Sequence, residues 1–203
     1  MNTKSLLLAA FVAAVGAVSG SAQVTSQNIV GYVRLSLSKG FSLIGNQLNN
    51  GNNAIGTVLN VPEGTAIYKF TGGKYVSNGF IDGGWEAPTM TLNPGEGFFI
   101  NVPAATTITL IGEVSLKNST ALAAGYNLLS VPVPLAGGLN DAAAGGLAAV
   151  EGDAVYQWTG SKFALNEYLD GAWSAGSAPT VKVGEGFFLK GAARTYDRNF
   201  SVN

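Results

Sequence analysis

The chain has 203 residues and a formal net charge of −1, and only 11 % of its residues are charged, against about a quarter in an average globular protein. It contains no histidine and no cysteine, which excludes an imidazole base, a thiolate nucleophile, thiolate metal sites and disulfides. A nearly neutral chain also lacks the basic surface that binds nucleic acid. We therefore expect a protein that is not an enzyme and that has no cofactor, no metal site and no nucleic-acid partner.

Residues 1–22 have the pattern of a secretory signal peptide. Lys4 precedes an apolar run from Leu6 to Val18, and small residues follow it up to Ala22. The run is too short for a membrane-spanning helix, and no later segment is apolar for long enough. We predict cleavage after Ala22, no membrane span in the mature chain, and a secreted protein in the periplasm, at the cell surface or in the extracellular matrix.

The first segment after the signal peptide alternates as a strand does. Ile29, Val33, Leu35 and Leu37 share one face. A strand at the end of a chain can add to the exposed sheet edge of a second copy and build a filament. These four residues are therefore candidates for strand addition in a homopolymer. The alternative is that the strand pairs inside its own repeat.

The remaining sequence contains an internal repeat in two copies. The stretch "EGTAIYKFTGGKY", which begins at Glu63, returns 88 residues later as "EGDAVYQWTGSKF", which begins at Glu151. Each stretch alternates with period two and then meets a glycine-bearing turn of hairpin length. We predict an all-β fold of two tandem homologous antiparallel β-sandwich-like repeats, residues 23–114 and 115–203.

One segment departs from the strand pattern. Residues 140–150, "NDAAAGGLAAV", are rich in alanine behind an Asn-Asp start, so we expect a short helix in the second repeat, although two glycines weaken it. Residues 53–59 are the counterpart in the first repeat and would form a helical turn at the same place.

The stretch "NPGEGFFI", residues 93–100, returns as "KVGEGFFL", residues 182–189. Proline followed by glycine is typical of a turn that delivers the chain into a strand. We interpret six residues as structural turn residues: Gly95, Glu96, Gly97, Gly184, Glu185 and Gly186. The alternative is that Glu96 and Glu185 form a catalytic carboxylate pair, as in a glycosidase, which would require a common cleft.

Aromatic residues also correspond between the repeats. The pairs are Tyr68 with Tyr156, Phe70 with Trp158, Tyr75 with Phe163, Phe80 with Tyr168, and Trp85 with Trp173. Such residues either fill the core across hairpins or stack on sugar rings. If sugar binding exists, Trp85 and Trp173 are the candidate residues, because side chains beside hairpin turns are the easiest to expose.

The blocks "NIVGYV" (28–33), "GFSLIGNQL" (40–48), "AIYKF" and "NPGEGFFI" together resemble a group of secreted, internally duplicated β proteins of Gram-negative bacteria, most of them known only as hypothetical proteins. The sequence is also similar, more loosely, to β-sandwich modules of large surface proteins. The resemblance implies extracellular binding, adhesion or scaffolding, and it supplies no catalytic residues. We expect a non-catalytic structural or adhesive protein whose partner is itself or a surface polysaccharide; the alternative is a carbohydrate-binding module.

Overall fold

The computed structural model describes residues 29–201, whose regular secondary structure is almost entirely β-strand, and the predicted signal peptide lies outside them. Within this range, no helix has the length and hydrophobicity needed to cross a membrane. The elements are β1 (Val30–Leu37), β2 (Gly40–Gly45), α2 (Ile55–Val58), β3 (Ala66–Thr71), β4 (Lys74–Ile81), β5 (Gly84–Trp85), β6 (Gly97–Val102), β7 (Thr106–Glu113), β8 (Lys117–Leu122), β9 (Gly125–Ser130), β10 (Gly137–Gly138), β11 (Ala154–Trp158), β12 (Phe163–Leu169), β13 (Ala172–Trp173), β14 (Thr180–Val181), β15 (Gly186–Gly191) and β16 (Arg194–Asn199).

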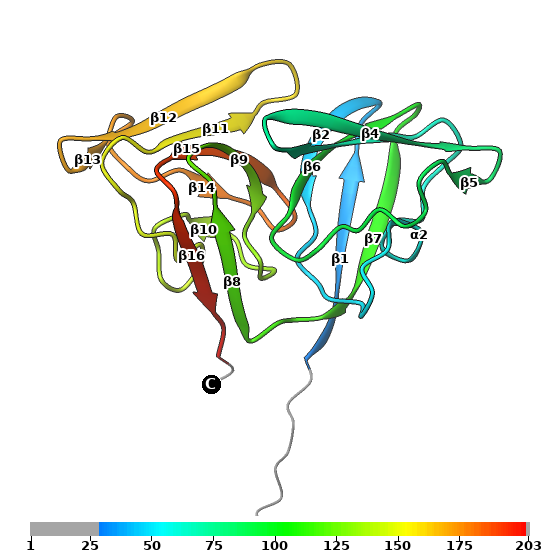
Figure 1. The fold of residues 1–203 in the computed structure, drawn as a ribbon, viewed down its shortest axis with the longest axis horizontal. Helices are drawn as coiled ribbons and strands as arrows, with labels where there is room; N and C mark the ends of the chain where they lie inside the picture. Colours follow the sequence, from blue (N-terminus) through cyan, green and yellow to red (C-terminus); the bar gives the residue numbers. More distant parts are fainter. Residues whose placement is uncertain (1–28, 202–203) are drawn as a thin grey trace, which may run out of the picture.

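Strands β1 to β7, here called the N-half, form a five-stranded sheet of order β2-β6-β3-β4-β5 and a two-stranded ribbon of β1 with β7. Strands β8 to β16, the C-half, form a sheet of matching order, β9-β15-β11-β12-β13, a ribbon of β8 with β16, and a short pair of β10 with β14. All pairings are antiparallel, and in each half the ribbon hangs below the sheet (Figure 1). The predicted all-β class is confirmed, whereas the predicted domain limits remain a prediction.

The hairpin between β4 and β5 shows how the local sequence sets a turn. Asp82 and Gly83 both have positive φ, 54° and 76°, as type I′ hairpin turns require. Their backbone amides donate to the carboxylate of Glu63 at 2.6 and 3.1 Å. The C-half builds the same turn, in which the amide of Asp170 donates to Glu151 at 2.9 Å. A glutamate from the preceding loop therefore fixes the far hairpin in both halves.

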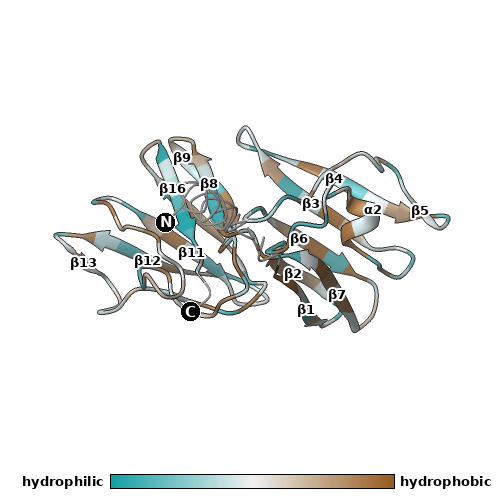
Figure 2. Ribbon diagram, turned by 90° about the horizontal axis from the view of Figure 1, so that it is seen from below, coloured by the Kyte–Doolittle hydropathy of each residue, from teal (hydrophilic) through white to brown (hydrophobic). Residues whose placement is uncertain are grey.

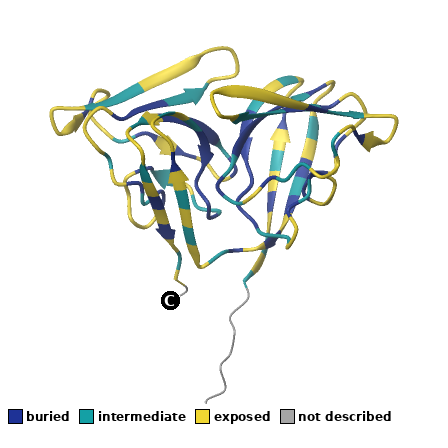
Figure 3. Ribbon diagram, in the orientation of Figure 1, coloured by how far each residue is buried: buried dark blue, intermediate teal, exposed yellow. Residues whose placement is uncertain are grey.

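One hydrophobic core runs through both halves. It contains the fully buried Phe98 of β6 and Phe187 of β15, together with Val33 and Ile108 of the first ribbon and Tyr196 of the second. Buried segments meet at the middle of the molecule in Figure 3, and Figure 2 shows hydrophobic segments on strands of both halves. Because the two sheets and the two ribbons share this core, the halves pack as one body.

The prediction of a short helix in the second repeat is wrong. The helix in the described part of the chain, α2, belongs to the N-half and makes a single turn. Residues 140–150 form turns and irregular backbone instead.

The reason is that carbonyl groups in this segment bond to side chains of β16. The carbonyl oxygen of Ala144 accepts a hydrogen bond from Arg198 Nε at 2.9 Å, and that of Gly145 accepts one from the Tyr196 hydroxyl at 2.5 Å. These contacts hold the irregular backbone of the segment against β16. Gly146 then adopts a φ of 68°, which leads the chain out of a helical path.

Candidate functional site: an aromatic surface where the two halves meet

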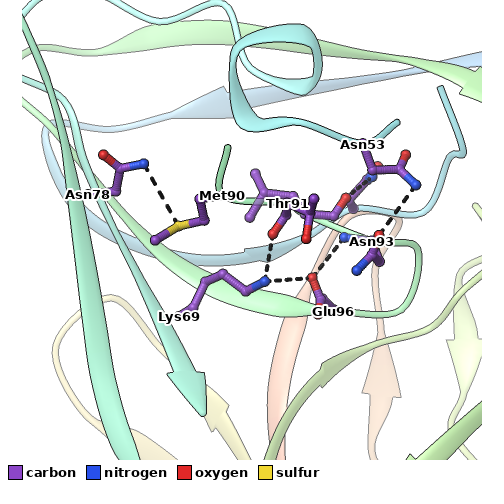
Figure 4. Close-up of polar contacts among 9 residues, drawn as sticks. Asn53, Lys69, Asn78, Met90, Thr91, Asn93 and Glu96 are labelled. Carbon is purple, nitrogen blue, oxygen red and sulfur yellow. Dashed lines mark hydrogen bonds and ion pairs between the residues drawn. The ribbon is translucent and has the colours of Figure 1, made fainter. Parts of the chain in front are cut away.

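The first Gly-Glu-Gly step is a turn held by its own glutamate (Figure 4). The Glu96 carboxylate accepts hydrogen bonds from the backbone amide of Asn93 at 2.8 Å and from Lys69 Nζ at 2.9 Å. Lys69 also donates to the carbonyl oxygen of Thr91 at 2.6 Å. The carboxylate therefore closes the turn and ties it to strand β3.

The second step is built in the same way with a different partner. The Glu185 carboxylate accepts from the amide of Lys182 and from Gln157 Nε2, both at 2.9 Å. These contacts commit each glutamate to its own turn, so the geometry offers no support for Glu96 and Glu185 as a shared acid/base pair. Residues 29–201 also contain no group of three or more acidic, histidine or cysteine side chains able to hold a metal ion.

Each turn contacts the opposite half of the molecule. Glu185 forms an isolated β-bridge with Ile44 of the N-half, and Glu96 forms one with Leu129 of the C-half. Ile44 and Leu129 hold equivalent places in β2 and β9. The contact is therefore reciprocal, as it is between identical subunits related by a two-fold axis.

The glycine that follows each glutamate is needed for this contact. A Cβ atom on Gly97 would lie 2.5 Å from the carbonyl oxygen of Leu129, and one on Gly186 would lie 2.7 Å from that of Ile44. Both neighbours are backbone atoms, which cannot rotate away as a flexible side chain can. The two glycines allow the halves to approach each other closely.

A further close approach joins Gly45 to Ser130, which end the equivalent strands β2 and β9. A Cβ atom on Gly45 would overlap the Cβ atom of Ser130. Only one of these two equivalent positions can therefore carry a side chain.

Gln47 provides the polar link at the same junction. Its side chain is fully buried, and Nε2 donates to the carbonyl oxygens of Val131 and Val133, both at 2.9 Å. Its Oε1 accepts the backbone amide of Gly184 at 2.7 Å. Three hydrogen bonds from one amide to the other half leave no part of this buried group unsatisfied and fix the halves relative to each other.

Aromatic side chains cover the sheet faces that are turned away from the ribbons, on both sides of the junction. Phe70 of the N-half packs against Phe188 of the C-half with ring centroids 5.2 Å apart, and Trp158 of the C-half packs against Phe99 of the N-half at 5.5 Å. Each half thus places the end of a hairpin on the sheet of the other. We call this set the aromatic surface: Phe41, Tyr68, Phe70, Tyr75, Phe99, Tyr126, Tyr156, Trp158, Phe163 and Phe188.

Two hollows open in the aromatic surface. Their buried floors include Phe99 and Phe188, and their rims include Phe41 and Tyr126, which are 48 % and 47 % exposed. The N-half hollow, of about 460 Å³, is lined by Phe41, Tyr68, Tyr75, Phe99 and Trp158. The C-half hollow, of about 310 Å³, is lined by Phe70, Tyr75, Tyr126, Tyr156, Phe163 and Phe188. Each hollow takes side chains from both halves, so neither exists without the junction.

Tyrosine hydroxyls are the polar groups of these hollows. The hydroxyl oxygens of Tyr126 and Tyr156 lie 3.4 Å apart in the C-half hollow. The pKa of Tyr156 is raised to about 12, mainly by this hydrogen bond and secondly by burial. Burial also raises the pKa of Tyr75, which borders both hollows. The fold thus favours the uncharged form of these two phenols.

Replacing Tyr126 with phenylalanine is expected to lower the pKa of Tyr156 towards the ordinary value of about 10. The folded pKa lies above the unfolded one, so the stability that this pair contributes is complete below about pH 10 and is lost as the pH rises from about 10 to about 12. Absorbance titration at the phenolate band checks the shift, with Tyr32→Phe removing an exposed phenol elsewhere as a control. An unchanged titration step near pH 12 in Tyr126→Phe would contradict this assignment.

The structure does not place the predicted tryptophans on a surface. Trp85 and Trp173 are 8 % and 7 % exposed, and each packs against an aromatic neighbour, Phe80 or Tyr168, with ring centroids 5.3 Å apart. Neither indole face is open to a sugar ring. The prediction that Trp85 and Trp173 bind carbohydrate is therefore wrong, because the tight hairpin turns beside them fold these rings back onto the core.

The residues predicted for strand addition lie in β1, or directly before it in the case of Ile29. All eight residues of β1 pair with β7 of the same chain, and Val33 and Leu37 are buried in the core. Ile29 and Leu35 pack against the same core cluster. In the described structure the segment therefore pairs inside its own half, which is the alternative to strand addition between copies.

Sequence reasoning named three of the aromatic pairs of the surface but missed Phe41, Phe99, Tyr126 and Phe188. For Phe99 the available signal was the alternation of side chains between the two faces of the strand that follows the Gly-Glu-Gly step. Because Phe98 points into the core, Phe99 must point to the opposite face of the same strand.

Comparison of the chain with protein-family models, with curated proteins and with solved structures gave no match. The proposals that follow rest on the residues of this chain.

Proposed function

We propose that this protein is a secreted, non-catalytic adhesive protein that binds polysaccharide through the aromatic surface. The observation that supports the proposal is the pair of open hollows, whose rims are half-exposed aromatic rings. Soluble proteins bury most such rings, so a contiguous exposed group of them indicates a binding surface. This is the carbohydrate-binding alternative of the sequence analysis, with different residues.

The chemistry of the hollows suits sugar rings. A pyranose presents a flat C–H face that packs on an aromatic ring, and its hydroxyls need hydrogen-bonding partners at the edge. The hydroxyls of Tyr68, Tyr75, Tyr126 and Tyr156 offer such partners beside the apolar walls. The hollows are open to solvent, which favours one or two rings of a long chain over an enclosed small molecule.

Self-assembly through the N-terminal strand has less support. Addition of β1 to another copy would require it to leave β7, which exposes Val33 and Leu37 and breaks the pairing along eight residues. The aromatic surface needs no such rearrangement. We therefore favour adhesion over filament formation as the function.

Tryptophan fluorescence offers a direct test, because Trp158 lines the N-half hollow while the other two tryptophans are buried in the core. Titration with galactan, β-glucan, mannan and polygalacturonate should change the emission of Trp158 for at least one polymer. Replacing Phe41 with alanine should weaken that binding about tenfold, which corresponds to a loss of about 1.4 kcal/mol.

The matched control is Tyr32→Ala, which removes a 71 % exposed aromatic residue from the ribbon of the same half. It should bind as the wild type does. Absence of any response across the panel would refute the proposal, as would self-association that depends on Phe41 and is indifferent to sugar.

A further inference from the structure

A groove continues from the N-half hollow. It has a volume of about 590 Å³ and shares Phe41 and Trp158 with the hollow. Its walls come from opposite halves: residues 34–37 and 41–44 form one side, and residues 157–160 and 180–185 contribute to the other. A chain molecule lying in the hollow can therefore extend along the junction.

This groove carries two cations. Arg34 and Lys182 both line it and are exposed, and within the described residues neither forms a salt bridge. The one acidic residue in the lining is Glu185, whose carboxylate already accepts hydrogen bonds from Gln157 and from the amide of Lys182. The groove thus has an excess of positive charge in a chain whose net charge is −1.

The C-half hollow continues into an equivalent groove that lacks these cations. That second groove has about 540 Å³, shares Phe70 and Tyr126 with its hollow, and has no lysine or arginine in its lining. Serine at position 119 corresponds to Arg34, and asparagine at position 93 corresponds to Lys182. The two sides of the junction therefore match in their aromatic walls and differ in charge.

We propose that the ligand is an anionic polysaccharide, whose sugar rings pack in the N-half hollow while its carboxylate or sulfate groups pair with Arg34 and Lys182. This inference rests on the proposed function. Exposed ion pairs contribute modestly and are screened by salt, so they select among polymers that the aromatic rings already hold. The side with charge favours the acidic chain, and the other side binds sugar rings without regard to charge.

The test compares three polymers with related backbones: neutral galactan, polygalacturonate and a sulfated galactan. The wild-type protein should bind at least one acidic polymer roughly tenfold more tightly than galactan at low ionic strength, and this preference should fade in 0.5 M salt, where the screening length falls to a few ångströms. Arg34→Gln with Lys182→Gln should abolish the preference and leave galactan binding unchanged. Lys117→Gln, which removes an exposed cation from the distant strand β8, should leave both unchanged.

The outcomes separate the two proposals. Galactan binding that depends on Phe41, without any preference for acidic polymers, would overturn the anionic ligand and leave the proposed function standing. Binding of acidic polymers that Phe41→Ala does not weaken would overturn both, because charge alone would then explain it. Preference for only one acidic polymer supports the inference and assigns carboxylate or sulfate as the group recognised.

Discussion

Replacing Arg194 with alanine is expected to lower the free energy of unfolding by about 3–5 kcal/mol. Arg194 makes two parallel hydrogen bonds to the carboxylate of Asp153, at 2.7 and 2.6 Å, and the Asp153 side chain is 1 % exposed. Removing the guanidinium leaves a buried carboxylate whose one further polar partner among residues 29–201 is the amide of Val150. Chemical denaturation monitored by circular dichroism measures the loss.

The N-half supplies a control for this prediction, because the equivalent positions are Thr65 by the sequence repeat and Thr106 by the register of the ribbons. In that half Thr65 Oγ1 donates to the carbonyl oxygen of Pro62 at 2.7 Å, and no ion pair is needed. The double variant Asp153→Thr with Arg194→Thr should therefore recover most of the stability lost in Arg194→Ala. A double variant as unstable as the single one would show that the ion pair is not the cause.

The second large effect is expected from alanine at Gly97 or Gly186, with a loss of about 3 kcal/mol for either substitution. The added Cβ atom would lie within 3 Å of backbone atoms of the opposite half, so relief requires the halves to move apart. Such a movement strains the hydrogen bonds of Gln47 and opens the shared core. Thermal unfolding of both variants should show a single, lowered transition.

Gly31→Ala is the matched control, since Gly31 lies inside strand β1 and its nearest neighbour to a new Cβ atom is Leu48 Cδ2 at 4.0 Å. This substitution should leave the stability unchanged or raise it slightly through reduced freedom of the unfolded chain. If all three variants were equally unstable, loss of glycine flexibility would explain the result better than the close contact between halves.

The strands and their turns follow from local rules, which is why the all-β class was predictable. Alternation and glycine turns depend on neighbours in the sequence, and the turn at Asp82 is readable from its Asp-Gly pair. The relation between the halves was not predictable, because the bridges of Glu96 and Glu185 join residues far apart in the sequence. The repeat identified the steps as turns, and only the fold shows that each turn contacts the opposite half.

The same limit explains why the sequence did not predict the candidate site in full. A central strand such as β6 is covered on both faces, so alternation alone does not say which face is the core and which is the aromatic surface. Trp85 and Trp158 both follow the aromatic pattern of a strand, yet one packs inside its own half and the other reaches across the junction. The helix error has a comparable origin, since Arg198 lies far from the carbonyls that it binds in residues 143–144.

The meeting of Gly45 with Ser130 has a consequence for how such a molecule can be assembled. A pair of N-halves would set glycine against glycine and leave a gap, and a pair of C-halves would bring two Cβ atoms into collision. Two repeats made as separate chains would have to pair with the other kind of repeat and avoid pairing with their own kind. One continuous polypeptide removes that choice, because every first repeat is synthesised already attached to the complementary second.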